Sequence, residues 1–205
     1  MDARLSAVLA RLEQRIELED EETKRLSREE FERRRDEWML AVGRETGTLL
    51  NLLAKAGQCR RILEVGTSVA YSTLWLADAA RSTEGRVTTL DNSPNKHVQA
   101  RSNLADAGLS GMVELVAGDA IESLARLAGP WDFVLLDFNR GLYRKSLETV
   151  MAKLTPGALI VADNMLRPEV SVPQAKEYQA WVRALPGMQS LLLPVGNGIE
   201  LTRKD

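Results

Sequence analysis

The 205-residue sequence has few of the residues that support cross-links or histidine chemistry. It contains one cysteine, Cys59, and one histidine, His97. A single cysteine cannot form an internal disulfide, and it is compatible with a reducing compartment such as the cytoplasm. His97 falls within an expected helix, and we interpret it as a surface residue rather than a catalytic base.

Long apolar runs and an excess of one charge are also missing. No stretch approaches the roughly 20 apolar residues that cross a bilayer, and the charged start from Asp2 onward is unlike a signal peptide. The 27 basic and 29 acidic residues give a net charge of −2, which argues against general nucleic-acid affinity without excluding it. The G-x-G-x-x-G fingerprint is absent, which disfavours a nicotinamide-dependent oxidoreductase. We therefore expect a cytoplasmic protein with no membrane partner.

The pattern of elements predicts an α/β fold. Strands expected near 61–65, 86–90, 113–117, 132–136 and 158–162 alternate with helices near 71–82, 94–107, 119–127 and 142–153. Continuously apolar strands are typical of parallel sheets that are buried on both faces. This alternation predicts a doubly wound, Rossmann-like sheet that is mostly parallel. A helix near 174–184 and strand-like runs at 190–194 and 199–202 predict a C-terminal antiparallel hairpin.

The first 40 residues carry many charges and an apolar stripe at helical spacing. We expect helices near 3–18, from Ser27 through Trp38, and near 44–56. We interpret 1–205 as a single domain, with a helical extension at 1–40 and a cofactor-binding core at 41–205. The apolar stripe packs either on the main domain or on a second subunit, and we expect a homodimer.

Acidic and amide side chains follow the expected strands. A strand, an acid and a Gly-Thr turn run through Glu64, Gly66 and Thr67, and Asp91 ends the next strand. In a doubly wound fold, the carboxyl ends of the strands form the ligand site. Further strands end at Asp137 and at Asp163-Asn164, and hard oxygen ligands of this kind suit Mg²⁺ or Ca²⁺.

These motifs together resemble one family. Further matching motifs are Val42-Gly43 with Gly47, Tyr71-Ser72, Gly118-Asp119-Ala120, Arg140 with Tyr143, and Leu193 to Gly198. In this order they are similar to the cation-dependent O-methyltransferases that use S-adenosylmethionine. That family includes catechol O-methyltransferase, plant caffeoyl-CoA O-methyltransferases and small bacterial enzymes. The resemblance runs from about Val42 to the C-terminus.

The resemblance implies roles for individual residues. Those assigned to S-adenosylmethionine are Val42, Glu64, Gly66, Thr67, Ser72, Asp91, Asp119, Ala120 and Asp137. Among them, Ser72 would contact the cofactor carboxylate, Asp91 the ribose hydroxyls, and Asp119 with Ala120 the adenine. From the residues alone, the Gly66 motif also fits an ordinary strand-to-helix turn, and Asp91 also fits a favourable charge at a helix N-terminus near Pro94.

The resemblance also implies a metal site. Asp137, Asp163 and Asn164 match the ligands of Mg²⁺ or another divalent cation, although aspartate and asparagine are common turn residues as well. The expected catalytic residues are Asp137 and Arg140. The family usually has lysine at position 140, often credited as a general base, whereas arginine stays protonated and can only orient an anion or steady a phenolate.

Two further departures concern loops. Ala70 stands where the family often has glycine, and alanine is tolerated there if its φ angle is negative. The segment 165–173 is shorter than in the relatives, which implies an acceptor site that is more open or is completed by the N-terminal helices.

The sequence therefore predicts a divalent-metal-dependent O-methyltransferase acting on a small, catechol-like acceptor. Two alternatives stay open: methylation of a hydroxylated uridine in tRNA, and a catalytically weak protein that only binds S-adenosylmethionine.

Overall fold

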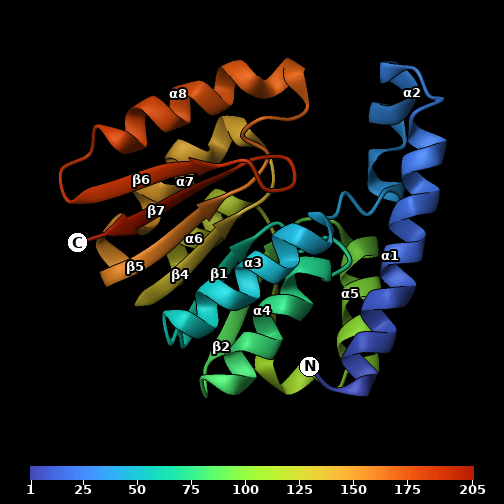
Figure 1. The fold of residues 1–205 in the computed structure, drawn as a ribbon, viewed down its shortest axis with the longest axis horizontal. Helices are drawn as coiled ribbons and strands as arrows, with labels where there is room; N and C mark the ends of the chain where they lie inside the picture. The colour runs from blue at the N-terminus through green and yellow to red at the C-terminus, as the bar shows by residue number, and fades with distance from the viewer.

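A computed structural model describes all of residues 1–205 (Figure 1). Seven strands form one sheet: β1 Arg61–Val65, β2 Arg86–Asp91, β3 Val113–Ala117, β4 Trp131–Leu136, β5 Leu154–Ala162, β6 Met188–Leu193 and β7 Ile199–Lys204. Eight helices surround it: α1 Ala3–Thr23, α2 Arg28–Arg33, α3 Gly43–Ala56, α4 Tyr71–Ser82, α5 Pro94–Asp106, α6 Ala120–Arg126, α7 Tyr143–Val150 and α8 Val172–Arg183.

The sheet has the order β3-β2-β1-β4-β5-β7-β6. Strands β1 to β5 run parallel, while β7 pairs antiparallel with both β5 and β6. This confirms the expected doubly wound sheet with its C-terminal antiparallel hairpin. The chain order reverses between β1 and β4, which is the topological switch point where such sheets bind ligands.

The two faces of the sheet bury different layers of helices. Alternate residues of β4 point to opposite sides: Phe133 and Leu135 join the core under α1, α3, α4 and α5, while Val134 and Leu136 join the core under α6, α7 and α8. The period-two alternation of a strand explains this division. Figure 1 shows the sheet between these two helical layers, with α1 outermost beside α5.

Several boundaries differ from the sequence-based expectation. The helix that opens at Ser27 has the expected capping box with Glu30, but it ends at Arg33 rather than at Trp38. The chain then turns through a short 3₁₀ segment, Arg35–Glu37, so that the ring of Trp38 stacks on Phe31 with 6.4 Å between centroids. Strand β5 begins at Leu154 rather than near residue 158, so it includes the Pro156-Gly157 pair. A register shift between β4 and β5 accommodates that pair.

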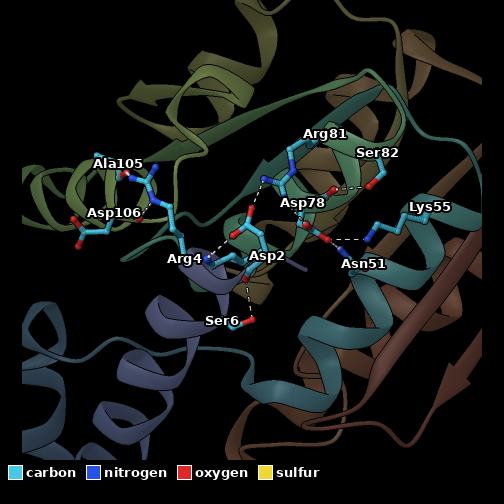
Figure 2. Close-up of polar contacts among 11 residues, drawn as sticks. Asp2, Arg4, Ser6, Asn51, Lys55, Asp78, Arg81, Ser82, Ala105 and Asp106 are labelled. Atoms are coloured by element: carbon cyan, nitrogen blue, oxygen red, sulfur yellow. Dashed lines mark hydrogen bonds and ion pairs between the residues drawn. The ribbon is translucent and has the colours of Figure 1, made fainter.

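The N-terminal helix packs on the main domain. Its apolar stripe, Leu5, Val8, Leu9 and Leu12, is buried in the same core as α4 and α5. Figure 2 shows how its first residues are fixed at the end of α4 and α5. Asp2 pairs with Arg81 at 2.6 Å, and Arg4 donates hydrogen bonds to the carbonyls of Ala105 and Asp106.

A buried ion cluster lies next to this anchor (Figure 2). The carboxylate of Asp78, 3% exposed, is within 2.7 Å of the Lys55 ammonium and 2.8 Å of the Arg81 guanidinium. Asn51 donates a further hydrogen bond at 3.1 Å. Burial alone would raise the pKa of Asp78, but these partners hold the pKa below its usual range.

The eight helices include none with the length and hydrophobicity that a membrane-spanning helix requires.

Candidate active site

The predicted site residues gather at the carboxyl edge of the parallel strands. Successive strand ends are joined through backbone hydrogen bonds, in which Asp137 N donates to Val65 O at 2.9 Å and Asp163 N donates to Leu136 O at 3.0 Å. On the other side, Gly66 N donates to Leu90 O at 2.9 Å. These bonds fix the loops after β1, β2, β4 and β5 relative to one another, as the parallel topology requires.

Gly66 allows the loop after β1 to pass close to the loop after β4. Its φ is +108°, and a Cβ built there would lie 1.9 Å from the carbonyl oxygen of Asp137. No other residue fits at this position. Ala70, four residues later, has a φ of +72°, so the negative φ under which alanine would be readily tolerated is not adopted here. The residue is the N-cap of α4 and is fully buried, which holds it in a conformation that normally favours glycine.

Glu64 is a buried carboxyl at the end of β1. It accepts hydrogen bonds from the hydroxyls of Ser72 at 2.6 Å, Thr73 at 2.5 Å and Thr89 at 2.6 Å. Burial raises its pKa to about 7, against the lowering effect of these hydroxyls. The hydroxyl of Ser72 is therefore turned toward Glu64. No side chain caps the first turn of α4, so its backbone N–H groups are left for an anion.

Asp91 has a fixed orientation at the end of β2. One carboxylate oxygen accepts from Ser68 N and the other from Ser93 N, both at 2.8 Å. Each oxygen retains a lone pair for another donor. Ser93, rather than Asp91, provides the side-chain cap of α5, and Asp91 lies beside the start of that helix through the bond from Ser93 N. His97 corrects a further expectation: it is 3% exposed, with Nε2 2.9 Å from the carbonyl oxygen of Asp91.

Val42, Asp119 and Ala120 frame this part of the edge. Val42 is buried at the start of α3. The segment before it lies over the Gly66 loop, because the Ser68 hydroxyl donates to the carbonyl of Met39. Asp119 caps α6 by accepting from Glu122 N at 3.0 Å. The sequence assigns Asp119 to adenine, and its exposed position at the end of β3 leaves it open to a ligand.

Lys96 is a site residue that the sequence analysis missed. It is 7% exposed in the first turn of α5, and no ion pair or side-chain hydrogen bond involves its ammonium group. Burial lowers its pKa, against the opposing charges of Asp91, Asp36 and Glu19. A signal was available, because a cation in the first turn of a helix is disfavoured by the helix dipole. The position of Lys96 is therefore not explained by the stability of α5.

Asp137, Asp163 and Asn164 are brought together as predicted. Asn164 Nδ2 donates to Asp137 Oδ1 at 2.7 Å, and Asn164 N donates to Asp163 Oδ1 at 2.6 Å. Asp163 Oδ2 is buried and has no partner. Burial raises the pKa of Asp137 to about 6, and burial together with Asp137 raises that of Asp163 well above its usual range.

The donor set fits a hard divalent cation. Two carboxylates that repel one another and an orphaned carboxylate oxygen need a positive charge, and carboxylate and amide oxygens suit Mg²⁺. No three acidic, histidine or cysteine residues converge anywhere in the chain. A cation here would therefore be held by the two carboxylates and the side-chain oxygen of Asn164, which now accepts only a 3.3 Å hydrogen bond from Asn197.

Arg140 lies beside these ligands. Its Nη1 donates to the carbonyls of Asn164 and Arg167, both at 2.9 Å. The guanidinium thus ties the loop after β4 to the loop after β5, and its buried Nε has no partner. The closing hairpin supports the same loop, because Met165 N donates to Gly198 O at 2.9 Å. Arg140 is therefore an organised part of the site rather than a solvated loop residue.

Comparisons with known proteins agree with this geometry. The sequence profile of a family described as O-methyltransferase matches residues 14–205. A catechol O-methyltransferase of Mycobacterium tuberculosis is 41% identical over 129 residues, which are 62% of this chain and 58% of that protein. A catechol O-methyltransferase of Niastella koreensis is 33% identical over 167 residues, which are 75% of each chain.

A solved structure extends the likeness to the whole chain. It is the O-methyltransferase TomG from Streptomyces achromogenes, in complex with S-adenosylmethionine, with a TM-score of 0.76 and 26% identity. The match covers 100% of this chain and 90% of that one. The family expected from the sequence motifs is confirmed: this chain belongs to the S-adenosylmethionine-dependent O-methyltransferases.

Proposed function

We propose that this protein transfers the methyl group of S-adenosylmethionine to one hydroxyl of a small catechol-like acceptor, with a divalent cation, Mg²⁺ by preference, at Asp137, Asp163 and Asn164. The observation that carries the proposal is the pair of neighbouring carboxylates, Asp137 and Asp163, at the carboxyl edge: Asp163 Oδ2 is buried without a partner, and the pKa values of both groups are raised. The names of the two similar proteins, both catechol O-methyltransferases, support the acceptor class.

The cofactor would lie along the loops after β1, β2 and β3. Asp91, already oriented by two backbone N–H groups, would accept from both ribose hydroxyls. The Gly66 loop allows close approach of the methionine portion, with Glu64, Thr67 and Asp137 behind it. The first turn of α4, with Ser72, would receive the methionine carboxylate, while Val42 and the pair Asp119-Ala120 would bound the two ends.

Asp137, Asp163 and Asn164 would hold the cation, which when bound would lower the pKa of the acceptor hydroxyl to be methylated. The residues of the site would position the attacking oxygen for transfer of the methyl group. Arg140 stays protonated and cannot take the proton, so its role is to orient the acceptor and to stabilise the developing phenolate. The proton of the hydroxyl then leaves to solvent.

Chelation tests the proposal most directly. Methyl transfer from labelled S-adenosylmethionine to catechol should require Mg²⁺ and should stop in excess EDTA. Binding of S-adenosylhomocysteine, measured by calorimetry, should persist under the same conditions. Two of the three proposed metal ligands, Asp163 and Asn164, are not among the cofactor residues. Full activity in EDTA would contradict the metal role. Cofactor binding without transfer to any catechol, with Mg²⁺ present, would instead favour a protein that only binds the cofactor.

Arg140 gives a second test through the pH profile. With arginine in place of lysine, the alkaline rise of kcat should follow the acceptor's own ionisation in the metal complex, so it should shift between catechols of different acidity. Arg140→Lys should keep or raise kcat, because lysine can lose and regain its proton. An unchanged rate and pH profile in both Arg140→Lys and Arg140→Ala would remove Arg140 from the mechanism.

The expected homodimer and cytoplasmic location stay proposals. Light scattering after size exclusion measures the oligomeric state, and a monomer at micromolar concentration would contradict the first.

A further inference from the structure

A cleft of about 280 Å³ opens beside the proposed metal site. It is lined by Arg35, Phe138, Asn139, Arg140, Ser171 and Gln174. Arg35 belongs to the segment after α2, the next three follow β4, and the last two lie at the start of α8. In Figure 1 the end of α2 and the start of α8 stand on opposite sides of the carboxyl edge. The cleft is therefore completed by the N-terminal segment, as the short 165–173 loop suggested.

The charged residues that line this cleft are all cationic. Two of its six lining residues are arginines, and none is acidic. Arg35 has one ion pair, to Glu32 at 3.5 Å, and both side chains are about half exposed. An exposed pair of this length contributes little and is easily exchanged for another anion. Nη1 of Arg140 donates hydrogen bonds to two backbone carbonyls, and the buried Nε of the same side chain has no partner.

The position of Arg35 is well defined although its side chain is exposed. The carbonyl of Glu37, two residues later, accepts from Arg15 Nη2 at 3.1 Å. Met39 N donates to Glu19 at 2.7 Å. Both partners belong to α1, which is packed on the main domain. The segment that carries Arg35 is thus fastened to α1 on its C-terminal side.

The cleft adjoins the proposed metal ligands through two of its lining residues, Phe138 and Arg140. Phe138 follows Asp137 in the chain, and Arg140 contacts the carbonyl of Asn164. A ring whose two oxygens lie at Asp137 and Asn164 would have its far side in this cleft, beside Phe138. A single aromatic side chain, Phe138, in a mostly polar lining with two guanidinium groups matches an aromatic ring that carries a negatively charged substituent.

We infer that the acceptor is an aromatic acid, with vicinal hydroxyls at the metal ligands and a carboxylate held in this cleft by Arg35, with Arg140 beside it. The inference rests on the proposed function and narrows its acceptor. Arg35 is then a specificity residue contributed by the N-terminal segment. A planar guanidinium binds a carboxylate through two parallel hydrogen bonds, which a lysine cannot reproduce.

The test compares two acceptors of one shape, 3,4-dihydroxybenzoate and 3,4-dihydroxybenzamide, which differ in charge. Calorimetry with Mg²⁺ and S-adenosylhomocysteine present measures their binding, and kcat/KM measures their methylation. The wild-type protein should favour the acid by about tenfold or more on both measures, the size of a charge-assisted contact. Arg35→Gln should reduce this acid-to-amide ratio toward one, and Arg35→Lys should restore it in part.

Arg33→Gln is the matched control, because Arg33 is exposed on α2 and does not line the cleft. Its acid-to-amide ratio should equal that of the wild type. An amide bound as well as the acid by the wild type would overturn the inference, as would an unchanged ratio in Arg35→Gln. Failure to methylate either compound, or catechol itself, would instead count against the proposed function.

Discussion

Two groups of acidic side chains in this molecule have opposite surroundings. Asp78, between α3 and α4, is surrounded by Lys55, Arg81 and Asn51, and its pKa is held below the usual range. Asp137 and Asp163, at the carboxyl edge, have no side-chain cation within ion-pair distance, and their pKa values are raised. The first group has its charge balanced by protein side chains, whereas the second would have its charge balanced by the cation that we propose there.

Acids of the first kind stabilise the fold, whereas acids of the second kind lower its stability. A buried carboxylate with protein partners links helices, and removing one partner leaves a charge uncompensated. Buried carboxylates without partners cost stability and persist where function needs them. Four experiments test this comparison.

Removal of Asp78 should have the largest effect on stability. Asp78→Ala leaves Lys55 and Asn51 without their shared acceptor, and we expect a loss of about 3–4 kcal/mol in the free energy of unfolding. Urea denaturation measures it. Asp106→Ala, which breaks the exposed Arg11–Asp106 pair, should cost at most about 1 kcal/mol. Equal losses in the two variants would refute the contrast between buried and exposed pairs.

Asp163→Asn should separate stability from activity. Asparagine keeps an oxygen for Asn164 N but removes the buried charge, so the metal-free protein should gain on the order of 1 kcal/mol of stability. Methyl transfer should fall at least about 100-fold, because one cation ligand is weakened. Unfolding curves without metal and rates with Mg²⁺ measure the two effects. A destabilised but active variant would reverse the assignment of Asp163.

Glu64 predicts a pH dependence of stability. Its pKa is raised from 4.5 to about 7 in the folded protein, so the folded state binds its proton more tightly than the unfolded state. The contribution of Glu64 to stability should therefore be greatest below about pH 4.5, where the residue is protonated in both states, and should fall by roughly 2–3 kcal/mol as the pH rises to about 7.

Glu64→Gln should remove that share of the decline when unfolding is compared at pH 5 and pH 8. Glu114→Gln on β3 is the control, because its carboxylate is exposed and contacts only Thr88 at 3.3 Å. If Glu64→Gln declines as steeply as the control, the buried carboxyl is not the source.

Lys96 should give the smallest effect. It is a cation that lowers the pKa of Asp137 without contacting it, so it also repels a bound metal. Lys96→Met should tighten Mg²⁺ or Mn²⁺ binding about two- to fivefold, as expected for charges separated by several ångströms in a partly polar medium. Calorimetry measures the affinity, with Lys145→Met on the exposed face of α7 as control. Weaker metal binding in Lys96→Met would indicate that Lys96 helps to hold the site in place.

The strand ends were predictable because a parallel sheet converts sequence order into spatial order. Asp91, Asp137 and Asp163 each follow a buried apolar strand, so their convergence follows from topology alone. Lys96 could have been noticed from its place in the first turn of a helix. His97 and the φ of Ala70 were not predictable in either way, because burial and backbone conformation there depend on how neighbouring elements pack, which no local pattern encodes. The early end of α2 has the same origin, since it follows from the stacking of Trp38.

Helix α1 connects the two ends of the sheet. Its first turn is fixed beside Arg81 and Asp106, and its far end carries the segment with Arg35 (Figure 1). A substitution in the first few residues that shifts α1 would therefore also shift the segment that carries Arg35 beside the proposed acceptor cleft. Exchanging this helix and the following segment between relatives offers a route to new acceptor preferences, provided that the contact of Met39 with the Gly66 loop is kept.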